Sequence, residues 1–109
     1  MLIEFNAIES GFSDGLGGAS GDHYYVVFGL QGDSQDGKDV YFEFDDQING
    51  GVNLVSQIVV SHSDVTFTLL NSATIRAIRN MDDAGWSKFL QCITETFEPQ
   101  IVQASGRYE

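Results

Sequence analysis

The sequence predicts an α+β domain in which an antiparallel sheet of about five strands packs against a C-terminal amphipathic helix. Two patterns lead to this fold class. Before residue 70, apolar residues alternate with polar ones in short segments, as they do in half-buried strands. Near the end of the chain they recur every three or four residues instead, which is typical of a helix with one buried face. A chain of 109 residues suffices for one modest core, so residues 1–109 are expected to form a single domain.

The first part of the chain is expected to supply two strands joined by a long loop. Residues 2–9 alternate between apolar and polar side chains, and residues 23–30 are almost continuously apolar. The second strand is therefore predicted to be central and covered on both faces. Residues 10–22 are rich in Gly and Ser, which predicts a loop because glycine loses much conformational freedom in a regular element. Residues 32–39 are polar and are expected to form the next turn.

The most informative segment begins at Val40. Val40, Phe42 and Phe44 are expected to point into a core, because alternate residues of a strand share one face. An Asn-Gly-Gly turn is expected at residues 49–51, since Asn and Gly tolerate a positive φ. Between strand and turn, polar side chains are expected to form a rim: Glu43, Asp45, Asp46 and Gln47.

Residues 53–60 and 65–69 are expected to pair as a β hairpin, because both carry the strand pattern and a short polar connection separates them. Residues 72–81 fit two structures. Ile75 and Ile78 lie at helical spacing behind a potential cap, which favours a short helix, and a short edge strand is the alternative.

The final helix is expected to start at residues 82–83, where an Asp can cap it, and to stop before Pro99. Its apolar stripe comprises Trp86, Phe89, Leu90, Ile93 and Phe97. Phe42 and Phe44 are the expected partners of this stripe on the sheet. The tail, residues 100–109, is short and polar and is expected to fray.

The charge balance narrows the range of partners. Five Lys and Arg stand against sixteen Asp and Glu, a formal net charge of −11. Binding to nucleic acids or anionic membranes is disfavoured because each requires a basic surface on the protein. A strongly acidic protein suits a basic protein partner, and the alternative is that the acidity only keeps the protein soluble. A single cysteine, Cys92, excludes an internal disulfide, and neither a signal peptide nor a membrane-spanning segment is visible. The sequence therefore predicts a cytoplasmic location.

No catalytic or metal-binding motif is recognised. Asp45 and Asp46 are adjacent, so on a strand their carboxylates point to opposite faces and converge on one atom only where a bulge intervenes. His23 and His62 lie in no spacing that is typical of metal ligands, and Cys92 has no paired His. We therefore expect no enzyme activity, no metal and no cofactor.

The order of these features resembles the immunity protein 10 family. The similarity covers about residues 23–97 and depends most on the strand and acidic end at 41–47, followed by the Asn-Gly-Gly of 49–51 and an apolar hairpin. Members are small acidic bacterial proteins of polymorphic toxin systems and are thought to bind and neutralise a co-encoded toxin.

This resemblance implies a cognate toxin, expected to be basic, as the partner. The positions that match its motif, and thus the expected partner-binding residues, are Glu43, Asp45, Asp46, Gln47 and Asn49. Gln47 and Asn49 have a second interpretation, in which their side chains satisfy backbone groups of the turn. The alternative function is a non-enzymatic acidic interaction module or assembly subunit unrelated to toxins. A ligand-binding or enzymatic pocket between sheet and helix is the least favoured reading, and the oligomeric state stays open.

Overall fold

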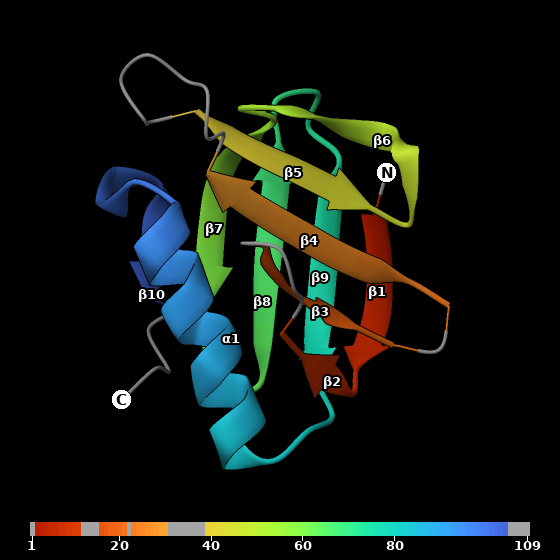
Figure 1. Cartoon of the computed structure of the whole chain (residues 1–109), viewed down its shortest axis with the longest axis vertical. Coiled ribbons are helices and arrows are strands. Elements are labelled where there is room, and N and C mark those ends of the chain that lie inside the picture. The colour runs from red at the N-terminus through yellow and green to blue at the C-terminus, as the bar shows by residue number, and fades with distance from the viewer. Residues whose placement is uncertain (1, 12–15, 22, 31–38, 105–109) are drawn as a thin grey trace.

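A computed structural model describes residues 2–11, 16–21, 23–30 and 39–104, with residues 46–48 described by their backbone alone. In this part of the chain, ten strands form two five-stranded sheets, and one α helix packs beside them (Figure 1). The predicted α+β class is confirmed. The single antiparallel sheet that the sequence predicted is replaced by two sheets that enclose the core between them.

The first sheet has the strand order β1-β9-β8-β7-β10. Its strands are β1 (Leu2–Ala7), β9 (Thr74–Arg79), β8 (Asp64–Leu69), β7 (Val55–Val60) and β10 (Val102–Ala104). The hairpin of β7 and β8 is antiparallel, as predicted. The two edge strands are parallel to their neighbours, β1 to β9 and β10 to β7, so this sheet is mixed.

The second sheet is antiparallel throughout and has the order β2-β3-β4-β5-β6. Its strands are β2 (Glu9–Ser10), β3 (Gly17–Ser20), β4 (Tyr25–Leu30), β5 (Val40–Phe44) and β6 (Asp46–Val52). Figure 1 shows β4 and β5 crossing obliquely over β8 and β9 of the first sheet. As predicted, β4 is central and buried on both faces, with neighbouring side chains Val26 and Val27 0% and 6% exposed.

The helix α1 (Asp83–Thr96) begins as predicted, with Asp82 at its N-cap accepting a hydrogen bond from the Gly85 amide at 2.8 Å. It packs against β2, β3 and β4. It is not the last element, because the 3-10 turn η1 (Pro99–Ile101) and β10 follow it. Among the described residues, no helix combines the length and apolar character that crossing a bilayer requires.

Aromatic rings fill the space between the two sheets and the helix. Phe28 of β4 lies 6.1 Å from Phe67 of β8, measured between ring centroids, which joins the sheets. Phe89 and Phe97 at the helix pack on these two rings at 5.1 to 6.4 Å. The expected helix partners were Phe42 and Phe44. Instead, Phe42 reaches the aromatic cluster through Phe67, at 5.2 Å.

The prediction of a loop over residues 10–22 is wrong for β3. Gly17 faces the helix, where an added Cβ would come within 2.9 Å of the Cys92 Cβ. Ala19 is fully buried in the same strand. The small residues therefore belong to a strand that lets the helix approach closely, and not to a loop.

The favoured helix over residues 72–81 is also wrong, because this segment forms β9. Ile75 and Ala77 are buried, while Arg76 points outward to ion pairs with Glu4 and Asp64. The strand alternative is correct, although β9 lies inside the sheet between β1 and β8 and not at an edge. The expected fraying of the tail is wrong for β10, which pairs with β7.

Candidate functional site

The acidic end of β5 does not form the exposed rim that the sequence predicts. Glu43 is only 8% exposed, and its two carboxylate oxygens accept hydrogen bonds from the hydroxyl groups of Tyr41 and Tyr25. We call these three residues the Glu43 cluster. The expectation that Glu43 belongs to a solvent-facing rim is corrected, because its acceptor groups are engaged within the protein.

The Glu43 cluster also changes the chemistry of Tyr41. The hydrogen bond that Tyr41 donates to Glu43 raises the pKa of the Tyr41 phenol above its ordinary value, and partial burial and the negative charge of Glu43 act in the same direction. The phenol is thus held in its neutral, donating form. The cluster connects β4 to β5 through side chains and stabilises the fold at this point.

The chain reverses direction at Asp45, earlier than predicted. Asp45 is exposed and has a φ of 66°, a left-handed conformation that Asp tolerates better than most residues. Phe44 and Asp46 pair across this turn. The turn expected at residues 49–51 is therefore wrong, since Gly51 pairs with Phe42 as part of β6.

The remaining predicted site residues fall into two groups. Asn49 donates a hydrogen bond from Nδ2 to the carbonyl of Phe44 at 3.1 Å, in agreement with its interpretation as a residue that satisfies the backbone. Asp46 and Gln47 belong to β6, but their side chains lie outside the described residues. Of the predicted set, Asp45 is the residue whose described side chain is exposed.

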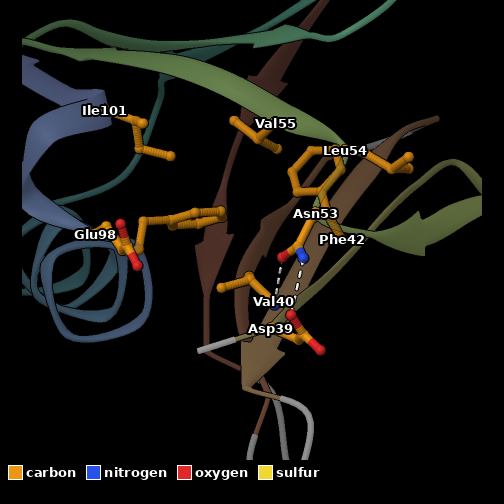
Figure 2. Close-up of a pocket in the computed structure, with 9 residues that line it drawn as sticks. Asp39, Val40, Phe42, Asn53, Leu54, Val55, Glu98 and Ile101 are labelled. Carbon is orange, nitrogen blue, oxygen red and sulfur yellow. Dashed lines mark hydrogen bonds between the residues drawn. The ribbon is translucent and has the colours of Figure 1, made fainter. Parts of the chain in front are cut away.

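An open pocket lies at the other end of β5, and its volume is about 350 Å³ (Figure 2). We call it the β5 pocket. Its described lining includes six apolar residues: Val40, Phe42, Leu54, Val55, Phe97 and Ile101. The same described lining includes three polar residues: Asp39, Asn53 and Glu98. The polar lining residues come from the start of β5, the connection between β6 and β7, and the segment that follows α1. The pocket therefore lies where the two sheets meet the end of the helix.

Asn53 organises the mouth of the β5 pocket. Its φ is 57°, and its amide donates to the carbonyl of Val40 at 2.8 Å. Its side chain accepts from the Val40 amide at 2.9 Å and donates from Nδ2 to Oδ1 of Asp39, also at 2.9 Å. The dashed lines in Figure 2 mark the two side-chain bonds, and the second of them fixes the Asp39 carboxylate beside Asn53.

Glu98 supplies the second carboxylate, and Figure 2 shows it on the opposite side of the pocket from Asp39. Its position is set by the end of α1 and by Pro99, which begins η1. The Glu98 side chain is exposed, and its Oε2 accepts a hydrogen bond from Gln100 at 2.6 Å. Two carboxylates thus flank an apolar floor.

A second cavity of about 390 Å³ lies near the turn of β5 and shares Leu54 with the β5 pocket. We call it the Leu70 cavity, because Leu70 at its rim is 70% exposed. Its described lining residues carry no formal charge: Phe44, Asn49, Gly50, Leu54, Leu69, Leu70, Asn71 and Ala73. In their described linings, the two cavities differ in charge more than in size.

The β5 pocket is suited to binding a cation that carries an apolar part. Carboxylates accept hydrogen bonds from cationic groups, and the apolar lining favours removal of hydrocarbon from water. The described lining offers neither a thiol nor an imidazole. Within the described ranges, no group of three or more His, Cys, Asp or Glu residues is placed to hold a metal ion.

Sequence reasoning missed Asp39, Asn53 and Glu98 because they are far apart in the chain. Local signals exist for two of them. Asn53 follows Gly-Gly-Val, a context in which Asn is suited to a left-handed turn. Glu98 precedes the only proline, where a helix is expected to end. Neither signal reveals that the two residues share a pocket.

The chain was compared with protein-family models, with curated proteins and with solved structures, and none of them matches. The resemblance to the immunity protein 10 family therefore stays a prediction from sequence features.

Proposed function

We propose that this protein is a cytoplasmic, non-enzymatic immunity protein that binds a cognate bacterial toxin domain and neutralises it. The observation that carries the proposal is an open apolar pocket flanked by Asp39 and Glu98, on a chain with a formal net charge of −11. The resemblance of residues 23–97 to the immunity protein 10 family supplies the class of partner.

The physical basis is electrostatic attraction followed by apolar burial. Toxins that act on nucleic acids tend to have basic clefts, and an acidic protein approaches such a cleft faster than a neutral one does. Complementary charge raises the rate of association more than it raises the affinity. A stable complex therefore also needs apolar surface at the contact. The β5 pocket combines both properties in one place.

Co-expression with a candidate cognate toxin domain tests this function. We expect cells to survive and a one-to-one complex to be purified, with association slowing as ionic strength rises. A toxin that carries an inactivating substitution controls for expression. Cell death without a complex, from a toxin shown to be active, would overturn the proposal.

The charge variants for this experiment follow from the structure. Glu43 is buried in its cluster, so Glu43→Lys tests folding and not docking. Asp45 is exposed, so Asp45→Lys is the suitable variant at this end of β5. We expect Asp45→Lys to slow association with little effect on dissociation, because a charge outside the β5 pocket acts mainly on the rate of encounter.

The second candidate function is an acidic interaction module or assembly subunit unrelated to toxins. The Leu70 cavity favours it, since a cavity whose described lining is uncharged and carries an exposed leucine suits a protein partner of any charge. Light scattering on the purified protein, with Leu70→Ser as the comparison, tests self-association through this surface. If the protein is a dimer and Leu70→Ser makes it a monomer, the result supports this candidate. If the protein is a monomer at high concentration, self-association is excluded as its role.

A further inference from the structure

We propose that the β5 pocket is the binding site for one arginine side chain that projects from the partner protein. The proposal deepens the proposed function and rests on it for the identity of the partner, the toxin. The chemistry of the occupant follows from the pocket itself, from its volume, its apolar floor and its two carboxylates.

The volume limits the occupant to a small group. Ligand pockets commonly measure about 300 to 1,000 Å³, so the β5 pocket, at about 350 Å³, is near the lower end of that range. It can take a single side chain and is too small for a helix or a folded loop. The inserted group has to project from a surface that otherwise stays outside.

The floor favours a hydrocarbon stem. Three of the lining residues are core residues, since Phe42, Phe97 and Val40 are 0%, 5% and 7% exposed. The pocket floor is therefore apolar surface at the edge of the hydrophobic core. Water beside such a surface is released when methylene groups replace it. Long basic side chains place their stems on apolar surface while the charged group reaches polar partners.

The two carboxylates favour a positive charge on that stem. Asp39 and Glu98 flank the pocket from opposite sides, and an anion between them would be repelled. A neutral apolar ligand would remove water from both carboxylates and return no hydrogen bond. A cation replaces the lost water with charge-assisted hydrogen bonds.

Arginine fits this arrangement better than lysine does. Its planar guanidinium group carries five donors in a fixed fork that matches a carboxylate, and it is less strongly hydrated than an ammonium group. It also stacks on aromatic faces, and Phe42 and Phe97 both line the pocket. Lysine is a compact point charge that gains less from either feature.

The pocket is organised before a partner arrives. Asn53 ties the start of β5 to the connection between β6 and β7 with three hydrogen bonds of 2.8 to 2.9 Å, one of which positions Asp39. A site that is already ordered loses less conformational entropy on binding. The Leu70 cavity, with similar volume and no charged residue in its described lining, serves as an internal control.

The first experiment titrates the isolated protein with n-butylguanidinium chloride while amide NMR signals are recorded. N-butylurea, which has a similar shape and no charge, is the matched control. We expect n-butylguanidinium to shift the amides of Val40, Asn53 and Ile101, and n-butylurea to shift them at least tenfold less at equal concentration. Equal shifts from both compounds, or shifts confined to the Leu70 cavity, would overturn the proposal.

The second experiment uses the complex with the toxin. In the double variant Asp39→Asn, Glu98→Gln, each new side chain keeps an oxygen at the same position, so the bond from Asn53 to residue 39 is retained. We expect the Kd for the toxin to rise about 30-fold, because removing one side of a desolvated charge pair is costly. The control is Glu95→Gln, which removes an exposed carboxylate of α1 outside the pocket and is expected to change the Kd less than twofold.

The two experiments separate failure of this inference from failure of the proposed function. A wild-type complex whose Kd does not respond to the double variant would overturn the arginine site and leave the immunity function standing. If no toxin complex forms, the immunity function fails, and the n-butylguanidinium titration still decides whether the pocket selects a guanidinium group.

Discussion

Two carboxylates at opposite ends of β5 have different surroundings. Glu43 is 8% exposed, and both of its oxygens accept hydrogen bonds from tyrosines. Asp39 stands at the mouth of an open pocket, where Asn53 holds one of its oxygens. The acidic side chains of this protein are therefore not all available to a partner. A carboxylate enclosed by donors of its own protein stabilises the fold, whereas one beside an open apolar surface is placed to meet a cation.

The largest loss of stability is expected from removing the buried carboxylate of Glu43. Glu43→Ala removes the acceptor of two charge-assisted hydrogen bonds, and we expect the free energy of unfolding to fall by about 3 kcal/mol. Urea unfolding of both proteins measures the difference. Glu95→Ala, at an exposed position, is the control and should change stability by less than about 0.5 kcal/mol. A loss below about 1 kcal/mol at Glu43 would mean that water replaces the carboxylate.

At the other end of β5, Asn53→Ala should cost about 2 kcal/mol, because it removes two side-chain hydrogen bonds and places Ala at a φ of 57°. Asn53→Gly keeps the backbone conformation and loses the same bonds, so we expect about half that loss. Urea unfolding distinguishes the two variants. Equal losses of stability in the two variants would show that the left-handed conformation at residue 53 has no steric cost for Ala.

A smaller effect, with a defined pH dependence, is expected at Tyr41. Tyr41→Phe should lower the free energy of unfolding by about 1 kcal/mol at neutral pH through one lost hydrogen bond. The folded-state pKa of Tyr41 is raised, so this contribution is fully present below the unfolded pKa, about 10, and is lost as pH rises through the folded pKa. Urea unfolding at neutral and alkaline pH should show wild type losing its advantage over Tyr41→Phe. A constant difference across that range would contradict the role of the hydrogen bond.

The smallest effect is expected at Asp45, where the carboxylate is exposed and the backbone is left-handed. Asp45→Gly should leave stability within about 0.5 kcal/mol of wild type, since glycine adopts this conformation without steric cost. Asp45→Ala should be less stable than Asp45→Gly by about 1 kcal/mol. Thermal unfolding of the two variants side by side measures this, and the reverse order would argue against the turn at Asp45.

Much of the secondary structure was predictable because its signals are local. Strict alternation identified the hairpin of β7 and β8, and helical spacing with an Asp cap identified α1. Residues 72–81 were ambiguous for the same reason, since Ile75 and Ile78 are compatible with a helix as well as a strand. Pairing with β1 and β8 decided the outcome, because such contacts override a propensity difference of less than about 1 kcal/mol per residue.

The candidate site was less predictable, because the residues that form it lie far apart in the chain. The acidic charge, the apolar face of β5 and the α+β class all follow from the sequence alone. The tertiary fold alone brings Tyr25 of a neighbouring strand to Glu43 and places Asp39 and Glu98 around one pocket. Whether a carboxylate is buried or available depends on which side chains surround it, and in a fold of two packed sheets those neighbours come from distant parts of the chain.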